Sequence, residues 1–174
     1  MKQLILITLV VLSAGCQSAY YAVWEKMVVE KRDILVGRVE DAKESQEDAQ
    51  QQFSSALDEF TQLINFDGGE LKSIYEQLKD QFEASEDSAA SVTGQIDKVE
   101  SVAEALFNEW QEELEKYNNN TLKRNSQRKL KDTQRRYSSL LNAMRKAESK
   151  MKPVLSALRD NVLYLKHNLN ASAI

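Results

Sequence analysis

Glycine and proline are scarce in this chain of 174 residues, which has five Gly and one Pro. Turns rely on these two residues, together with Asn and Asp, for their backbone angles, so the sequence allows few chain reversals. Charged residues make up 29% of the chain and hydrophobic residues 42%, which is typical of helical bundles and coiled coils rather than of disordered proteins. We therefore expect one all-α domain built from long helices.

Cysteine and histidine each occur once, as Cys16 and His167. A lone cysteine excludes a disulfide within the chain, and a single histidine excludes the usual zinc clusters and nucleophile–base pairs. Gly68 and Gly69 stand alone and do not form a glycine-rich phosphate loop. The sequence thus predicts no catalytic residue, no metal, no cofactor and no small-molecule substrate, and we expect that the protein is not an enzyme.

The N-terminal residues have the pattern of a signal peptide. A positive head, Met1-Lys2-Gln3, precedes a nine-residue apolar run at positions 4–12, far shorter than the roughly 20 residues of a transmembrane helix. The run leads into LSAGCQ at positions 12–17, where small residues precede the cysteine. This stretch resembles the lipobox of bacterial lipoproteins, with Ser13 at the position where leucine is usual. The alternative is an ordinary thiol near a secretory cleavage site.

The lipobox resemblance implies a location for the protein. Residues 1–15 would be removed, Cys16 would become an acylated N-terminus, and residues 16–19 would form a short tether. Two or three acyl chains such as palmitate, at about 0.8 kcal/mol per buried CH₂, anchor a protein firmly. Gln17 stands where Asp would retain a lipoprotein at the inner membrane, so the resemblance implies the outer membrane, with the protein facing the periplasm.

Apolar residues recur at alternating steps of four and three, the spacing of a coiled-coil seam. In the middle of the chain this step continues through Gly94 and fails only at Ser85 and Glu113. Two short turn signals, FDGG at 66–69 and NNNT at 118–121, separate the periodic segments and favour antiparallel neighbours. We expect an elongated antiparallel three-helix bundle, with helices of roughly 70 Å at about 20–65, 70–117 and 122–169.

The single proline, Pro153, falls inside the third predicted helix, where it removes one hydrogen bond and crowds the preceding turn. Equal counting from the turns places it opposite Ser85 of the second helix and Ala49 of the first. These polar and small residues predict a weak layer that opens for a partner. The alternative is a simple kink at a tolerated place.

Charge is divided unevenly among the three predicted helices. Residues 20–65 have five Lys/Arg against ten Asp/Glu, residues 70–117 have four against thirteen, and residues 121–174 have thirteen against three. Either the third helix pairs internally with two acidic helices, or its basic cluster engages anionic lipid or peptidoglycan. The net charge of −4 and the exported location argue against nucleic acid. The cluster consists of Lys123, Arg124, Arg128, Lys129, Lys131, Arg135 and Arg136.

The signal peptide, the FDGG turn and the closing segment LRDNVLYLKHNLNASAI together resemble a family of bacterial lipoproteins catalogued as domain of unknown function 2959. The resemblance extends over nearly the whole chain and implies a lipoprotein of Gram-negative bacteria, but it supplies no activity and no site residue. We expect an outer-membrane-anchored helical rod with a structural, spacing or adaptor role. The alternatives are a module that binds anionic envelope components, and an accessory subunit of an envelope transport or stress complex that contacts a protein partner or a second copy.

Overall fold

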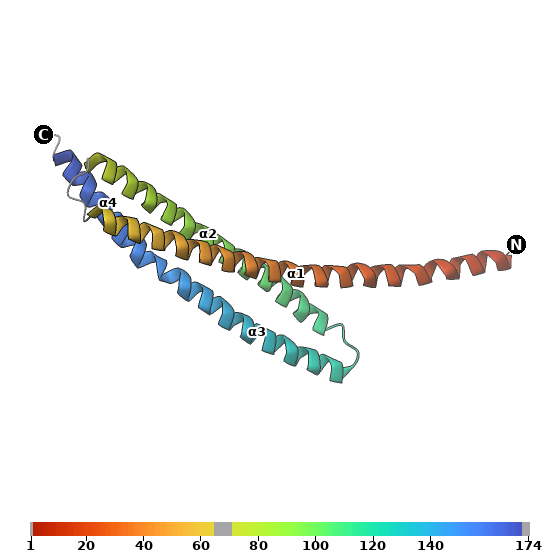
Figure 1. Ribbon diagram of the computed structural model, residues 1–174. Helices are drawn as coiled ribbons and strands as arrows, with labels where there is room; N and C mark the ends of the chain where they lie inside the picture. Colours follow the sequence, from red (N-terminus) through yellow and green to blue (C-terminus); the bar gives the residue numbers. More distant parts are fainter. Residues whose placement is uncertain (1, 65–70, 172–174) are drawn as a thin grey trace.

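The computed structural model describes the backbone of residues 2–64 and 71–171, and the side chains of residues 31–62 and 71–171. These residues form α1 (Lys2–Ile64), α2 (Leu71–Leu114), α3 (Asn120–Ser149) and α4 (Met151–Ala171). Only Lys150 separates α3 from α4, so the chain forms three long antiparallel rods (Figure 1). The prediction of an all-α, elongated three-helix bundle is confirmed.

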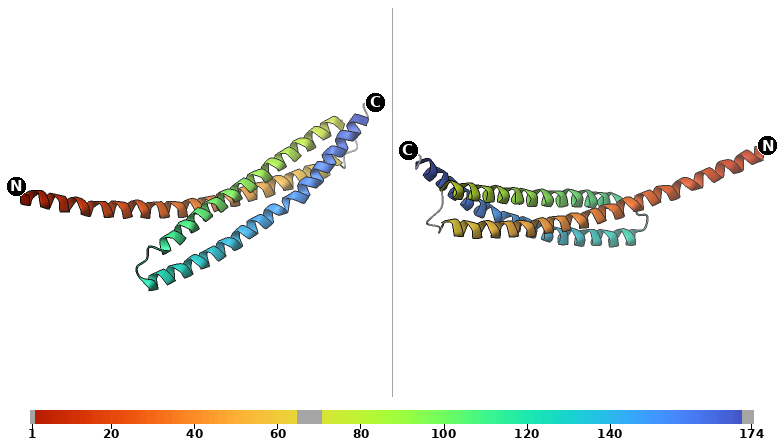
Figure 2. Two further views of the ribbon diagram at one scale, coloured as in Figure 1. Left: turned by 180° about the vertical axis from the view of Figure 1, so that it is seen from behind. Right: turned by 45° about the horizontal axis from the view of Figure 1, so that its top comes forward.

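The first helix is longer than predicted, because α1 begins at Lys2 rather than near residue 20. Its N-terminal part leaves the bundle as a single helical arm, beyond the end at which α2 turns into α3 (Figures 1 and 2). The side chains of Cys16 and Gln17 lie outside the described residues, as does the predicted FDGG turn at 66–69. The signal peptide at 1–15 and the tether at 16–19 stay predictions.

Asn119 caps α3 and so ends the turn between α2 and α3. Its side-chain oxygen accepts hydrogen bonds from the backbone N–H groups of Thr121 (2.9 Å) and Leu122 (3.1 Å), and its own backbone is extended. Asparagine is a favoured cap because its short side chain satisfies N–H groups that have no partner within the helix. The predicted NNNT signal is therefore where α3 begins.

The core consists of three clusters of buried side chains along the rod, and α2 contributes to each of them. In the middle cluster, α2 packs against α1 and α3. In the cluster near the C-terminus, it packs against α1 and α4. In the cluster beside the α2–α3 turn, it packs against α3. The three clusters centre on Val92, Ile96 and Met144, on Phe60, Leu78 and Leu158, and on Ala103, Leu114 and Leu130, respectively.

Small side chains let α1 and α2 approach each other closely. Ala42, Ala49 and Ala56 recur every seven residues in α1, and none is more than 2% exposed. The hydroxyl oxygens of Ser45 and Ser91 lie 3.2 Å apart across the same interface. The predicted seam of α1 is thus confirmed as the packing face toward α2.

The predicted seam of α2 is confirmed from Leu78 to Ala103 and shifts by one residue beyond that point. Phe107 is buried in place of the predicted Leu106. A straight α-helix has 3.6 residues per turn, so a strict repeat of 3.5 residues drifts around it. The shift brings the Phe107 ring edge-on to Tyr137 of α3, with ring centroids 5.4 Å apart.

The structure divides the predicted helix 122–169 in two at Lys150. Pro153 lies in the first turn of α4 and has no N–H to donate to the carbonyl of Ser149, four residues earlier. At the end of α3, the N–H of Lys150 donates to the carbonyl of Ala147, three residues earlier (3.1 Å). A bond over three residues rather than four closes a tighter turn and ends the α-helix. The helix is therefore interrupted next to the proline, and the weak layer that opens for a partner stays a prediction.

Pro153 does not lie opposite Ser85, contrary to the count from the turns. Thr93 of α2 donates a hydrogen bond to Glu148 (2.6 Å), and Glu86 of α2 pairs with Arg159 (2.9 Å). Pro153 lies about midway between Glu148 and Arg159, so its level on α2 is about one helical turn from Ser85, on the side of Ala89. The count assumes parallel rods, whereas α3 and α4 run obliquely to α2 (Figure 2). Ser85 is fully buried and its hydroxyl donates to the carbonyl of Gln81 (2.8 Å), so its polar group is satisfied.

Candidate functional site

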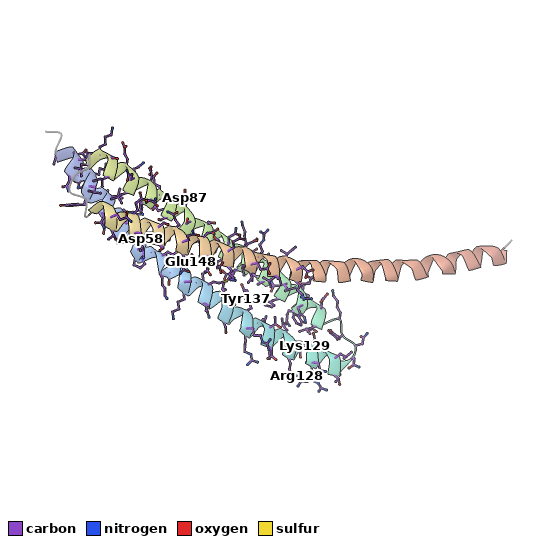
Figure 3. All side chains as sticks on the ribbon, in the orientation of Figure 1. Asp58, Asp87, Arg128, Lys129, Tyr137 and Glu148 are labelled. Carbon is purple, nitrogen blue, oxygen red and sulfur yellow. The ribbon has the colours of Figure 1, made fainter. Side chains whose placement is uncertain are left out.

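The predicted basic cluster lies on the N-terminal half of α3, next to the α2–α3 turn, where Figure 3 labels Arg128 and Lys129. Arg124, Arg128, Lys131 and Arg135 follow each other at steps of four, three and four residues and so share one face of the helix. All four side chains are exposed, because the core-facing residues of α3 lie on its opposite side. The structure therefore brings these predicted residues together as one outward stripe.

The cluster makes few ion pairs with the acidic helices. Lys123 pairs with Glu115 across the turn (2.8 Å), and Arg135 pairs with Asp132 of its own helix. The remaining cations have no acidic partner within 4.0 Å among the residues whose side chains are described. These cations are Arg124, Arg128, Lys129, Lys131 and Arg136. Arg128 donates a hydrogen bond to the amide oxygen of Asn125.

Farther along the rod, by contrast, basic residues do pair with α2. The guanidinium of Arg145 lies 2.5 Å from Asp97 and 2.9 Å from Glu100. The hydrogen bonds that the guanidinium donates to Asp97, and next to Glu100, raise the pKa of Arg145 above its usual value. Arg159 pairs with Glu86 at 2.9 Å. Arg145 and Arg159 thus pair with α2. Four other cations of the same half of the rod have no acidic partner within 4.0 Å among the residues whose side chains are described, and neither does most of the basic cluster; these four are Lys146, Lys150, Lys152 and Lys166.

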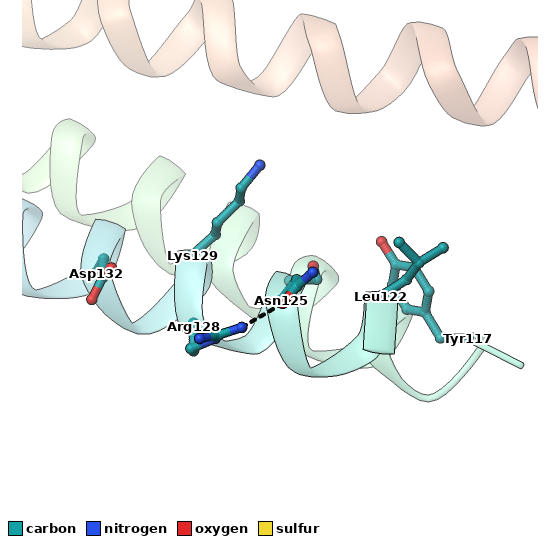
Figure 4. A pocket seen from close by; sticks show the side chains of 7 residues that line it. Tyr117, Leu122, Asn125, Arg128, Lys129 and Asp132 are labelled. Carbon is teal, nitrogen blue, oxygen red and sulfur yellow. Dashed lines mark hydrogen bonds between the residues drawn. The ribbon is translucent and has the colours of Figure 1, made fainter. Parts of the chain in front are cut away.

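An open hollow of about 580 Å³ lies beside the basic cluster at the α2–α3 turn (Figure 4). It contains two large apolar side chains in the open, because Tyr117 is 40% exposed and Leu122 is 54% exposed. Lys129 and Leu122 point to the side on which α1 passes. The hollow is lined by Tyr117, Leu122, Asn125, Ser126, Arg128, Lys129 and Asp132.

Sequence reasoning missed the apolar part of this site. The step of four and three residues through the middle of the chain ends on Tyr117 and so predicts it as a core residue. However, α2 ends at Leu114, so Tyr117 lies in the turn and is partly exposed. The seven-residue repeat that contains Leu130 reaches position 123 and not Leu122. This difference in spacing could have indicated from the sequence that Leu122 is exposed. The structure adds both residues to the predicted basic set.

A second hollow, of about 700 Å³, lies between α1 and the α3–α4 junction. Its apolar lining includes Phe53, Val92, Met151 and Val154. Leu57 also lines it and is 45% exposed, although its spacing predicted a core residue.

The remaining sequence expectations concern chemistry. His167 is exposed on α4. Within residues whose placement is described, no three His, Cys, Asp or Glu side chains come together as metal ligands. A membrane-spanning length of apolar residues does not occur in any helix of the described part of the chain.

Comparison with known proteins gives a family and no closer relative. Neither a curated protein nor a solved structure matches the chain. A family model described as "Protein of unknown function (DUF2959)" matches residues 20–174, a range that begins directly after the predicted tether. This range includes α2, α3, α4 and the part of α1 that packs in the bundle. The chain belongs to the DUF2959 family, as the resemblance of its sequence indicated.

Proposed function

We propose that this protein is a lipid-anchored helical spacer on the periplasmic side of the outer membrane, with Cys16 as its anchor. The continuity of α1 supports this proposal most directly, because a single helix joins position 16 to the far end of the bundle at Ile64. At 1.5 Å per residue this stretch spans about 70 Å. A site at the far end would therefore be held at a defined distance from the bilayer.

The returning helices make such a spacer stiff. An isolated helix gains little stability in water, whereas a helix packed along an apolar face is held by its neighbours. Gln46 donates a hydrogen bond from its amide to the carbonyl of Met144 (3.2 Å), and the amide of Gln52 donates to Gln81 (3.0 Å). These contacts tie the C-terminal third of α1 to both of the other rods.

The anchor is tested by cell fractionation. Cys16→Ser should release the protein from outer membranes, and Gln17→Asp should move it to the inner membrane. The matched control is Ser13→Leu, which restores the usual lipobox residue and should leave the protein in the outer membrane. Sedimentation of the Cys16→Ser protein with outer membranes after a high-salt wash would show that the anchor is wrong.

The spacing role is tested by measuring how far α4 lies from the bilayer. A fluorophore on Tyr164→Cys, at an exposed position of α4, should show no energy transfer to an acceptor dye in the bilayer that holds the acylated protein. Transfer as efficient as that from a probe at position 122, beside the arm, would contradict a rod that stands away from the membrane.

A second candidate function is the binding of an anionic envelope component by α3. The observation that favours it is the set of exposed cations without acidic partners, since internal pairing would have placed them against α1 or α2. The two functions are compatible, because the anchor acts through α1 and the basic cluster lies on α3.

A further inference from the structure

We propose that the tip of the α2–α3 hairpin rests on the anionic phospholipid surface of the membrane that holds the chain. The hairpin tip is defined by Tyr117, Leu122, Lys123, Arg124, Arg128 and Lys129. The inference rests on the proposed anchor for its orientation in the cell, but the contact itself can be measured without the anchor.

The first observation is the pair of apolar side chains at the tip. Leu122 and Tyr117 line the same open hollow and are 54% and 40% exposed. Leucine gains free energy when it enters the boundary between headgroups and acyl chains, and tyrosine suits that boundary because its ring is apolar and its hydroxyl is polar. The tip therefore has side chains that a bilayer can bury.

The second observation is the charge around these two side chains. Arg128 and Lys129 line the hollow, and Arg124 is exposed two residues beyond Leu122. The carboxylate in the hollow belongs to Asp132, which pairs with Arg135 of its own helix. Cations next to exposed apolar side chains are the combination that an anionic bilayer attracts.

The third observation is the position of the tip relative to α1. Lys31 Nζ lies 2.6 Å from Glu109 Oε2, which fixes α1 beside the C-terminal part of α2. From Lys31 the helix runs on for about 22 Å to position 16, at 1.5 Å per residue. The arm leaves the bundle at the same end as the hairpin tip in every view (Figures 1 and 2). A membrane that holds residue 16 therefore lies on the side of the tip, and Asp58 and Asp87 lie in the other half of the rod (Figure 3).

A phospholipid surface explains the site better than a glycan polymer does. Peptidoglycan could neutralise the cations, but it offers no apolar interior for Leu122. The proposal therefore commits to the bilayer, and peptidoglycan is an outcome of the test.

The test uses the full chain with Cys16→Ser, which has no native thiol and no acyl anchor. Leu122→Cys and Leu163→Cys each add one thiol for an environment-sensitive dye, at exposed leucines of α3 and α4. The labelled proteins are mixed with phosphatidylglycerol–phosphatidylethanolamine vesicles or with phosphatidylcholine vesicles. Segment 1–15 is present in all the proteins, and its insertion would hold the arm end of the bundle near vesicles of both kinds. The comparison of the two lipid compositions and the charge-reversal variants therefore separate tip contact from such tethering.

We expect the dye at position 122 to shift to the blue and to be quenched by nitroxide-labelled lipid, in anionic vesicles only. The dye at position 163 should stay in water. Arg128→Glu with Lys129→Glu should weaken vesicle binding at least tenfold. The same charge change at Lys150 and Lys152, which are exposed near the α3–α4 junction, should weaken it less than twofold. Circular dichroism checks that each variant stays helical.

Three results would overturn the proposal: an aqueous signal at position 122 in anionic vesicles, equal weakening by the two double variants, or binding to purified peptidoglycan without binding to vesicles. None of these results concerns Cys16. A failed tip contact leaves the anchor untouched, and a failed fractionation test leaves the vesicle result in place.

Discussion

Lys31 Nζ lies 2.6 Å from Glu109 Oε2, and this ion pair fastens α1 to α2 next to the place where α1 leaves the bundle. The Glu109 side chain is only 12% exposed and that of Lys31 is 32% exposed. The pair between Lys43 and Glu47 on α1 is 3.4 Å long and lies almost entirely in water. The two pairs have the same chemistry but different surroundings.

Lys31→Ala should therefore lower the free energy of unfolding by about 1–3 kcal/mol, because it leaves a largely buried carboxylate without a partner. Lys43→Ala, at the exposed pair, should change it by less than about 0.5 kcal/mol. Urea denaturation followed by circular dichroism measures both values. Equal effects of the two substitutions would show that the Lys31–Glu109 pair has no special role at the base of the arm.

The hydroxyl of Tyr137 is buried against Phe107 and has no hydrogen-bond partner among the described residues. Tyr137→Phe keeps the ring and removes the polar group, so it should raise the free energy of unfolding by about 1 kcal/mol at pH 7. Tyr164→Phe, at a position that is 65% exposed, is the control and should have little effect. A loss of stability in Tyr137→Phe would indicate that the hydroxyl has a partner.

The same tyrosine predicts a dependence on alkaline pH. Burial raises the pKa of Tyr137 above its usual value of 10. As pH rises past 10, the unfolded chain releases the tyrosine proton before the folded chain does, so the free energy of unfolding falls. Tyr137→Phe should lose less stability between pH 9 and pH 11 than the wild type loses. Identical slopes in denaturation curves over this range would contradict the raised pKa.

Ala49 is 2% exposed between α1 and α2, in the row of alanines that lets these helices approach. Ala49→Leu should lower the free energy of unfolding by about 1–3 kcal/mol, because the larger side chain forces the helices apart. Ala90→Leu makes the same change at an exposed position of α2 and should be nearly neutral. A tolerated Ala49→Leu would mean that the interface can widen without cost.

Pro153 is the reason that α3 and α4 are separate helices. Pro153→Ala restores the N–H that can bond to the carbonyl of Ser149, so amide exchange at residues 149–154 should slow. Exchange in the buried layer at residues 99–110, away from the junction, should not change. Hydrogen exchange with mass spectrometry measures both regions. Unchanged exchange at the junction would show that another residue divides the helices.

Periodic apolar residues made the three rods predictable, but not the details at their ends. The step of four and three residues identified Leu78, Val92, Ile96 and Val99 as core because burial on a helix depends on local spacing. It failed after Ala103 because a repeat of 3.5 residues does not match the 3.6 residues per turn of a straight helix, and this mismatch accumulates along the helix. The basic cluster could likewise be found by counting charges, since helical spacing puts its members on one face. Its lack of acidic partners depends on the angle between rods, which no local pattern encodes.

The sequence by itself determined the long helices, their antiparallel order and the basic cluster at the start of the third rod, because these features follow from chain-local periodicity, turn chemistry and charge. Only the tertiary structure decided that Leu122 and Tyr117 are exposed beside that cluster. It also decided that Arg145 and Arg159 pair with α2 while Arg124 and Lys131 do not. The physical reason is that exposure and ion pairing depend on distances between helices, and those distances are set by the oblique crossing of the three rods.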